Sequence, residues 1–317
     1  MFVLDLRNDL ATGETTANAI QTRAQGAYLG LAIGDALGAT VEFMTPAEIR
    51  ARHGIHRDLI GGGWLRLRRG QVTDDTGMSL ALGRALLARG RVEAGAIAEA
   101  FSGWMRTKPV DIGHTVRRGI ARYRRTGATE VPENTYDAGN GACMRTLPVA
   151  LFTLGAETED VAAACRTQAH VTHHNPLSDA ATLTVVRMVQ SAILGATREH
   201  LRELADALVA EDARFAFDRG RAENPGGYIV ETMRAVLQAL FATDGLETAL
   251  IDVVNRGGDA DTTGAILGMI VGALHGPEAI PRRWFDGLER TSARACLVQA
   301  QALVNASTLC RGRAQPR

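Results

Sequence analysis

The sequence has no excess of charge of either sign. Its 35 lysines and arginines are balanced by 35 aspartates and glutamates, which gives a formal net charge of +0 at pH 7. A neutral chain has no overall electrostatic attraction to nucleic acid or to an anionic membrane surface. We therefore expect no nucleic-acid partner.

Cysteine is scarce and shows no pattern. The cysteines form neither a CxxC pair nor a His/Cys spacing typical of zinc sites; they are Cys143, Cys165, Cys296 and Cys310. We predict free, mostly buried thiols, as is usual in a reducing cytoplasm.

Long apolar runs without charge are also lacking. No segment reaches the roughly 20 apolar residues that a membrane-spanning helix needs. The amino-terminal stretch MFVLDLRNDLATGETTANAIQTR has acidic and basic residues where a signal peptide would have an apolar core. These absences predict a cytoplasmic protein without a membrane segment of its own.

Signals for β-strands are equally rare. Aromatic residues make up only 5% of the chain, and no segment alternates regularly between apolar and polar residues. Apolar residues recur at helical spacing instead, and with 317 residues the chain is long enough to bury a sizeable core. We expect one all-α domain over residues 23–317, preceded by an N-terminal extension of residues 1–22.

Individual helices can be placed from their ends and their periodicity. In TPAEIRARHG, Thr45 is a typical N-cap, Glu48 completes a capping box, and Gly54 ends the helix. The stretch 55–73 is predicted to be a long loop, of a kind that is usually functional or mobile. Further helices are expected at residues 75–89, 92–106, 112–125, 140–154, 158–170, 177–195, 198–210, 227–242, 245–254, 262–275 and 288–307.

Glycine recurs every four residues in two segments far apart in the chain. The glycines are Gly26, Gly30, Gly34 and Gly38 in the first segment, and Gly264, Gly268, Gly272 and Gly276 in the second. On a helix this spacing forms one stripe, and each glycine costs about 1 kcal/mol of helix stability relative to alanine. Because such a stripe lets another backbone come close, we expect both helices at the centre of the bundle, packed on each other or on a neighbour. The alternative is an incidental richness in small residues.

Two clusters of threonine and aspartate stand directly before apolar helices, at residues 73–76 and 259–263. Both residue types are good N-caps, so plain capping is one explanation. A cap needs only one oxygen, however, and buried carboxylates without a partner are strongly unfavourable. Divalent cations would remove that cost, and a ligand set made of oxygen atoms suits Mg²⁺ or Mn²⁺ rather than zinc. The clusters therefore predict a site for two ions that share a carboxylate and polarise a water between them.

Five motifs, in this order, resemble the ADP-ribosylglycohydrolase family. They are GLAIGDALGATVEF, TDDTG, GNGACMRTLPVAL, THHNPLSDAA and RGGDADTTGAILG. The resemblance extends from residue 24 to about residue 290, and the pairing of an early TDD with a late GGDxDTxG is highly specific. It implies a single-domain orthogonal helical bundle with a binuclear metal site in a central cleft.

The resemblance also implies roles for individual acidic residues and threonines. The expected metal ligands are Thr73, Asp74, Asp75, Asp259, Asp261 and Thr262, with Asp261 bridging two Mn²⁺ or Mg²⁺ ions. The expected catalytic residues are Asp74, Asp75, Glu42 and Asp111. Either Asp74 or Asp75 is expected to accept the proton of the attacking water. A structural role is an equally good explanation of Glu42, and the role of a helix N-cap is an equally good explanation of Asp111.

A second set of residues is expected to bind the substrate. The turn Gly139–Gly141 has glycines that let backbone amides approach the pyrophosphate of ADP-ribose. His173 matches a family histidine beside the cleft, whereas His170 and His174 are expected to be ordinary polar residues. Asp111 and Tyr228 resemble positions that contact the ribose or the departing side chain. The full expected set is Gly139, Asn140, Gly141, His173, Tyr228, Gly257 and Gly258.

The implied reaction is hydrolysis of the N-glycosidic bond between ADP-ribose and a protein arginine. The longest matching stretches resemble bacterial members of the family that reactivate ADP-ribosylated dinitrogenase reductase and that a PII-type signalling protein recruits to the membrane. Other ADP-ribosyl substrates, namely ADP-ribosyl-serine and O-acetyl-ADP-ribose, are alternatives. So are a non-catalytic ADP-ribose-binding protein and an unrelated metal-dependent phosphohydrolase, although the sequence has no His/Asp motif for the latter.

Overall fold

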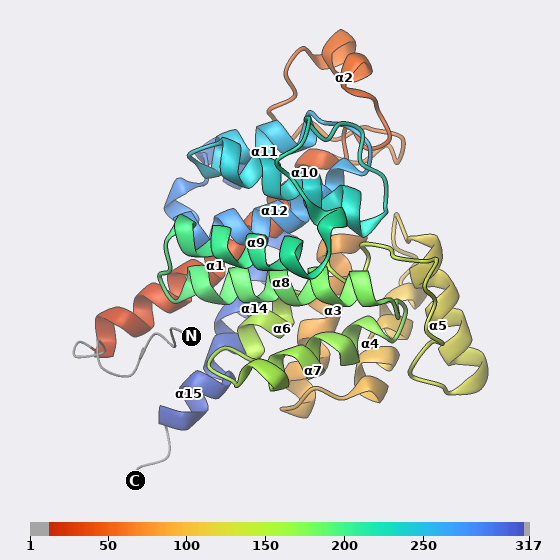
Figure 1. Ribbon diagram of the computed structural model, residues 1–317, viewed down its shortest axis with the longest axis vertical. Helices are drawn as coiled ribbons and strands as arrows, with labels where there is room; N and C mark the ends of the chain where they lie inside the picture. Colours follow the sequence, from red (N-terminus) through yellow and green to blue (C-terminus); the bar gives the residue numbers. More distant parts are fainter. Residues whose placement is uncertain (1–12, 314–317) are drawn as a thin grey trace.

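Helices account for the regular secondary structure of residues 13–313, the part of the chain that the computed structural model describes (Figure 1). Between them lie loops with two isolated β-bridges. The helices are α1 (Gly13–Gly38), α2 (Pro46–His53), α3 (Asp74–Arg89), α4 (Ala94–Arg106), α5 (His114–Thr126), α6 (Leu147–Phe152), α7 (Thr158–Ala169), α8 (Pro176–Ile193), α9 (Arg198–Glu211), η1 (Ala213–Phe215), α10 (Ile229–Ala242), α11 (Leu246–Val254), α12 (Ala260–His275), η2 (Pro277–Ala279), α13 (Arg282–Gly287), α14 (Arg290–Asn305) and α15 (Thr308–Arg313). The all-α, single-domain architecture expected from the sequence is confirmed.

One predicted helix, at residues 140–154, is much shorter than expected. The chain turns at Asn140, whose carbonyl oxygen accepts the amides of both Cys143 and Met144, and α6 begins only at Leu147. The other predicted helices begin and end within two residues of the observed ones. The short helices α13 and α15 were not predicted, because six residues are too few to show a helical period.

The predicted boundary between an N-terminal extension and the helical domain, at residue 22, falls inside α1. This helix is continuous from Gly13 to Gly38, and Ile20 is already part of the buried core. Residues 1–12 of the predicted extension lie outside the described residues.

Helices α1 and α12 pack on each other through their glycine stripes, as predicted. A Cβ added to Gly30 would lie 2.1 Å from the carbonyl oxygen of Gly268, and a Cβ added to Gly268 would lie 2.1 Å from that of Gly30. The same contact recurs at the pairs Gly26–Gly272 and Gly34–Gly264. The two helices therefore run antiparallel in direct backbone contact, which no side chain larger than hydrogen allows.

This contact fixes the end of α1 against the start of α12. A Cβ at Gly38 would lie 2.1 Å from the carbonyl oxygen of Ala260 and 2.5 Å from the Cα of Asp261. Beyond α1, the Phe43 amide donates to the Gly258 carbonyl oxygen at 2.7 Å, and the chain there runs beside the turn that leads into α12. The loop after α1 and the first turn of α12 thus form one unit.

All four cysteines are free, and three of them are buried, as expected. Within residues 13–313, no helix combines the length and the apolar character needed to cross a membrane.

We expect Gly30→Ala and Gly268→Ala each to destabilise the protein. The added methyl group meets a carbonyl oxygen that belongs to a packed helix backbone, so the two helices must separate. Overpacking of this kind typically costs about 1–3 kcal/mol or more, which exceeds the gain of up to about 1 kcal/mol from the better helix propensity of alanine. Chemical denaturation of each variant measures the change in the free energy of unfolding.

Gly95→Ala is the matched control. Gly95 also lies in a helix, α4, but apart from its chain neighbours and its own helix backbone no described atom lies within 4 Å of an added Cβ there. This variant should be as stable as the parent protein or slightly more stable. Equal stability of Gly30→Ala and the parent would show that the backbone contact is not tight.

Candidate metal centre and cleft

A cleft of about 420 Å³ brings together the amino-terminal ends of three helices. Its wall includes the first residue of α3, the first turn of α5 and the first turn of α12. The predicted site residues that line it are Glu42, Asp74, Asp111, Gly139, Asn140, Gly141, His173, Asp259, Asp261 and Thr262. Thr73, Asp75, Tyr228, Gly257 and Gly258 are not part of this wall.

Carboxylates gather at one side of the cleft. Oxygen atoms of Asp74, Asp75 and Asp261 lie within 4.8 Å of one another, and so do those of Glu42, Asp111 and Asp261. Asp261 belongs to both groups. All of these residues except Asp111 are buried, and Oδ1 of Asp75 is a buried atom without a hydrogen-bond partner among the described residues. Such an unpartnered oxygen among like charges fits a ligand set for a divalent cation.

Burial makes this cluster hold protons when no cation is bound. It raises the pKa of Glu42 to about 8, although a hydrogen bond from Trp64 opposes the shift. It raises the pKa of Asp74 to about 7, and the neighbouring Asp111 adds to the effect. The pKa values of Asp75 and Asp261 are also raised, by burial first and by the surrounding carboxylates second. A cation that binds here therefore displaces protons.

Asp35 is a buried acid beside the site that the sequence analysis did not single out. It lies in α1, is fully buried, and accepts hydrogen bonds from the backbone amides and the hydroxyls of Thr73 and Thr76. Burial raises its pKa to about 6, against the lowering effect of these hydrogen bonds. Asp35 thus connects α1 to the entrance of α3. One signal was available, because Asp35 is the only charged residue between positions 24 and 41.

Thr73, a predicted metal ligand, contacts both Asp35 and Asp75. Its hydroxyl donates to Asp35 Oδ1 at 2.8 Å and lies 3.2 Å from Asp75 Oδ2. The Thr73 side chain makes no capping hydrogen bond to α3. The oxygen atom of Thr73 is therefore held next to the carboxylates rather than used as a helix cap.

Asn140 orients Asp259, another acid of the cleft wall. Its Nδ2 donates to Asp259 Oδ2 at 2.7 Å and to Thr232 Oγ1 at 2.9 Å. The glycines beside it pack on an imidazole, since a Cβ at Gly141 would lie 2.8 Å from Cε1 of His173. The amide group of Asn140 is thus already engaged with the protein.

Gly257 and Gly258 shape the turn before α12 and do not face the cleft. Both have positive φ angles, 74° and 66°. A Cβ would lie 2.1 Å from the Met44 carbonyl oxygen at Gly257, and 2.1 Å from the Pro225 carbonyl oxygen at Gly258. Backbone crowding is sufficient to explain these two glycines, and their contact with the substrate stays a prediction.

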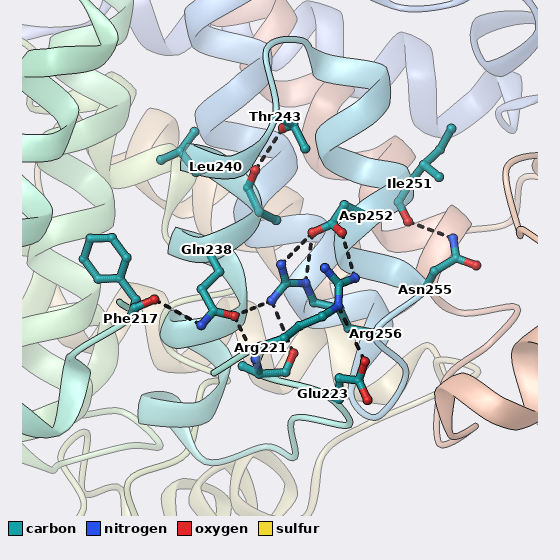
Figure 2. A network of polar contacts seen from close by, with 12 residues as sticks. Phe217, Arg221, Glu223, Gln238, Leu240, Thr243, Ile251, Asp252, Asn255 and Arg256 are labelled. Atoms are coloured by element: carbon teal, nitrogen blue, oxygen red, sulfur yellow. Dashed lines mark hydrogen bonds and ion pairs between the residues drawn. The ribbon is translucent and has the colours of Figure 1, made fainter. Parts of the chain in front are cut away.

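A buried arginine holds the chain that supports this turn (Figure 2). Arg256 donates two hydrogen bonds to Asp252 Oδ2, at 2.7 and 3.0 Å, and one to the Ala222 carbonyl oxygen at 3.2 Å. Three residues further along, the Asp259 amide donates to the Pro225 carbonyl oxygen at 2.7 Å. Hydrogen bonds from residues on both sides of the turn therefore hold the segment around Pro225 in place, and they position Asp259.

The rim of the cleft carries an exposed aromatic pair. Phe43 and Trp64 are 64% and 53% exposed, and their ring centroids lie 5.4 Å apart. Trp64 Nε1 donates to Glu42 Oε2 at 2.7 Å. Phe43 has a φ of 62°, a strained conformation for a bulky residue. Trp64 lies in the predicted loop 55–73, but nothing in its sequence context indicated that it faces the acids.

Two further predicted residues lie at the margin of the site. Tyr228 is 39% exposed and forms an isolated bridge with Gly139, so it adjoins the glycine turn from outside the cleft wall. Asp111 is half-buried, and its Oδ1 accepts the amide of Ile112 instead of one from α5. Asp111 therefore does not act as the N-cap of α5, and that alternative is excluded.

His170 and His174 lie outside the cleft. Their rings stack with centroids 3.7 Å apart, and both Nδ1 atoms lie 3.3 Å from Glu130 Oε1. Other protein groups also engage these rings, since His170 Nε2 lies 2.8 Å from Asp179 Oδ2 and His174 Nδ1 lies 3.0 Å from the Val131 carbonyl oxygen. This geometry favours the expected role of ordinary polar residues, and the His170 carbonyl oxygen also accepts the Val131 amide.

The family model for ADP-ribosylglycohydrolase matches residues 16–313. Over 289 residues the chain is 50% identical to the ADP-ribosyl-[dinitrogen reductase] glycohydrolase of Rhodospirillum rubrum, covering 91% of this chain and 98% of that protein. It is 32% identical over 283 residues to the ADP-ribosylarginine hydrolase Tri1 of Serratia proteamaculans, covering 84% and 75%, respectively.

A solved structure shows the same architecture. The chain is similar to a structure titled ADP-ribosylglycohydrolase-related protein complex, with a TM-score of 0.82 and 33% sequence identity, over 92% of this chain and 100% of that one. The family model, the similar proteins and the solved structure all point to the family that the sequence motifs resemble, and those motifs contain the clustered carboxylates. The chain belongs to the ADP-ribosylglycohydrolase family.

Proposed function

We propose that this protein is a metal-dependent hydrolase that cleaves the N-glycosidic bond between ADP-ribose and an arginine side chain. The observation that carries the proposal is the buried cluster of carboxylates at the cleft. Within the part of the chain that the structure describes, Asp75 Oδ1 has no hydrogen-bond partner and Asp261 belongs to two groups of acids. Two relatives named for ADP-ribosyl hydrolysis support the substrate class. The set of oxygen ligands fits two Mn²⁺ or Mg²⁺ ions.

The expected metal ligands divide between two elements of the fold. Those from the α3 side are Thr73, Asp74 and Asp75, and those from the α12 side are Asp259, Asp261 and Thr262. When bound, the ions would supply positive charge that polarises a water and the ribose hydroxyls. Asp261 is the proposed bridging ligand.

The chain's own residues then direct the proton and the substrate. Asp74 lines the cleft, whereas Asp75 is fully buried, and Asp74 is therefore the better acceptor for the proton of the attacking water. Water attacks the anomeric carbon, the bond to the guanidine nitrogen breaks, and that nitrogen takes up a proton. Backbone amides of the turn Gly139–Gly141 are proposed to face the diphosphate.

The cleft rim suits a guanidinium group better than a neutral side chain. Glu42 and Asp111 provide carboxylates next to the exposed rings of Phe43 and Trp64. A cation gains from nearby carboxylates and from the face of an aromatic ring. Arginine is therefore preferred over the alternatives ADP-ribosyl-serine and O-acetyl-ADP-ribose. The clustered acids also favour an enzyme over a non-catalytic ADP-ribose-binding protein.

The proposed target protein is ADP-ribosylated dinitrogenase reductase. The support is the 50% identity to the Rhodospirillum rubrum protein, which covers nearly the whole of both chains. A PII-type signalling protein as partner, and recruitment to a membrane through it, stay predictions from the resemblance. A cytoplasmic location remains a prediction as well.

Asp261→Asn should abolish most of the activity. The variant keeps the shape of the side chain but removes the charge shared by both acidic groups. We expect release of free ADP-ribose from an ADP-ribosyl-arginine protein to require added Mn²⁺. We also expect release to fall by at least about a hundredfold in the variant, since charge stabilisation at a metal centre contributes several kcal/mol.

The control for this experiment is Asp286→Asn, which changes an exposed carboxylate on α13. It should leave the rate unchanged. An ADP-ribosyl-serine protein assayed in parallel separates the two substrate classes. Metal-independent release, or full activity of Asp261→Asn, would contradict the proposal.

The stability of the metal-free protein should fall as the pH rises from 5 to 8. The pKa values of Asp74 and Glu42 are raised to about 7 and about 8 in the folded state. A raised folded-state pKa stabilises the protein below the unfolded-state pKa of about 4, and this contribution is lost as the pH rises through the folded-state value. Thermal unfolding in EDTA and in excess Mn²⁺ measures the effect.

Bound Mn²⁺ should reverse much of this loss, because the cation favours the ionised acids and binds more tightly as protons leave. Asp261→Asn should have a smaller fall in EDTA and little response to Mn²⁺. Identical pH dependence in EDTA and in Mn²⁺ would argue against a cation at these carboxylates.

Trp64→Ala should raise KM for the ADP-ribosyl-arginine protein by about twofold to thirtyfold, the range of a cation–π contact. Trp64→Phe keeps a ring but removes the donor to Glu42, so comparing the two variants separates these roles. Steady-state kinetics with each variant checks the prediction. An unchanged KM in Trp64→Ala would place the arginine elsewhere.

A further inference from the structure

His173 presents one edge of its ring to the cleft and the other to the protein interior. The residue is 3% exposed and lines the cleft. A Cβ added to Gly139 or Gly141 would lie 3.0 Å from His173 Nε2. The Nε2 edge therefore lies against the glycine turn, whereas Nδ1 lies 2.8 Å from Oγ1 of Thr172.

A buried arginine lies behind this pair. Arg145 is fully buried, and its Nη2 donates to Thr172 Oγ1 at 2.8 Å and to the Gln168 carbonyl oxygen at 3.0 Å. Its Nε donates to Gln168 Oε1 at 3.0 Å. Arg145 can only donate hydrogen bonds, so the Thr172 oxygen must act as the acceptor in their contact.

The hydrogen bonds that link Arg145, Thr172 and His173 determine which nitrogen of the imidazole carries a hydrogen. Thr172 Oγ1 has two side-chain partners among the described residues, Arg145 and His173. If the Thr172 hydroxyl donates to His173 Nδ1, both that hydroxyl and Nη2 of Arg145 have acceptors, and Nε2–H faces the cleft. If Nδ1–H donated to Thr172 instead, the buried hydroxyl hydrogen would have no acceptor, which is unfavourable. Nδ1 is therefore an acceptor.

Only one of the two ring nitrogens of His173 carries a hydrogen. Burial lowers the pKa of His173 to about 3, and the nearby positive charges of Arg145 and Arg118 act in the same direction. A neutral imidazole whose Nδ1 accepts must carry its hydrogen on Nε2. The edge next to the glycine turn is thus a hydrogen-bond donor.

We propose that Arg145, acting through Thr172, holds His173 as the Nε2–H tautomer and so makes it a neutral donor to the diphosphate of bound ADP-ribose. Arg145 and Thr172 are positioning residues, and His173 makes the contact. The opposite tautomer would turn a lone pair toward the phosphate oxygens and repel them. The identity of the ligand rests on the proposed function, whereas the tautomer does not.

The first test reads the tautomer directly in the protein without substrate. In ¹⁵N-histidine-labelled protein, long-range ¹H–¹⁵N correlation spectra report which ring nitrogen is protonated, and the His173 signals are assigned by their loss in His173→Asn. We expect protonated Nε2 and unprotonated Nδ1 from pH 5 to pH 8. Thr172→Ser should retain this pattern and Thr172→Val should lose it. A protonated Nδ1 in the parent protein would overturn the proposal.

The second test measures the consequence for binding. Thr172→Val should weaken the binding of ADP-ribose, and raise KM, by about tenfold to a hundredfold, as expected for a hydrogen bond to a charged group. It should change kcat much less. Thr172→Ser should restore both values, and Thr184→Val, at a threonine that donates to its own helix backbone, is the control substitution.

The two readouts separate this inference from the proposed function. If no ADP-ribosyl substrate is hydrolysed, the proposed function fails, while the NMR spectra and ADP-ribose binding still test the tautomer and its effect. If hydrolysis occurs but Thr172→Val binds ADP-ribose as tightly as Thr172→Ser does, His173 is not positioned for the ligand in this way and the inference is wrong.

Discussion

The backbone contact between α1 and α12 is the constraint on which the site depends. At Gly34, an added Cβ would lie 2.0 Å from the carbonyl oxygen of Gly264, so the helices approach as closely as their backbones permit. Each glycine weakens its own helix, and the packing of one stripe on the other compensates for this. The contact sets the first turn of α12, with Asp261, beside the end of α1. It thereby determines how close the acids from distant parts of the sequence can come.

The second constraint is electrostatic and follows from the first. Several carboxylates are brought into a buried space where each raises the pKa of the others. The fold reduces the cost in part, because Asp35 accepts hydrogen bonds from Thr73 and Thr76, and the amino-terminal ends of α3 and α12 favour negative charge. The remaining charge requires protons or cations. Asp75 Oδ1, which has no hydrogen-bond partner within residues 13–313, is the atom where this requirement is most evident.

Much of this arrangement could be predicted from the sequence, because it rests on local patterns. The glycine spacing predicted the central helix pair, and the two Thr/Asp clusters predicted which acids would meet. The role of Asp35 was missed because it depends on partners in α3, although its isolation among apolar residues was a signal. The position of Trp64 was not predictable, since the conformation of a long loop is set by tertiary contacts rather than by its own sequence. The predicted substrate contact of Gly257 and Gly258 stays a prediction, and the structure adds a second reason for these glycines, the nearby backbone, which their sequence context alone did not indicate.

The central claim is that the paired helices assemble a site for two cations among these acids. Electron paramagnetic resonance of Mn²⁺ titrated into the metal-free protein tests it most directly, with Asp261→Asn as the comparison. The account predicts two bound ions per chain whose spins are coupled through a shared ligand, and loss of that coupling in the variant. Binding of no Mn²⁺, or the same uncoupled signal in both proteins, would contradict it.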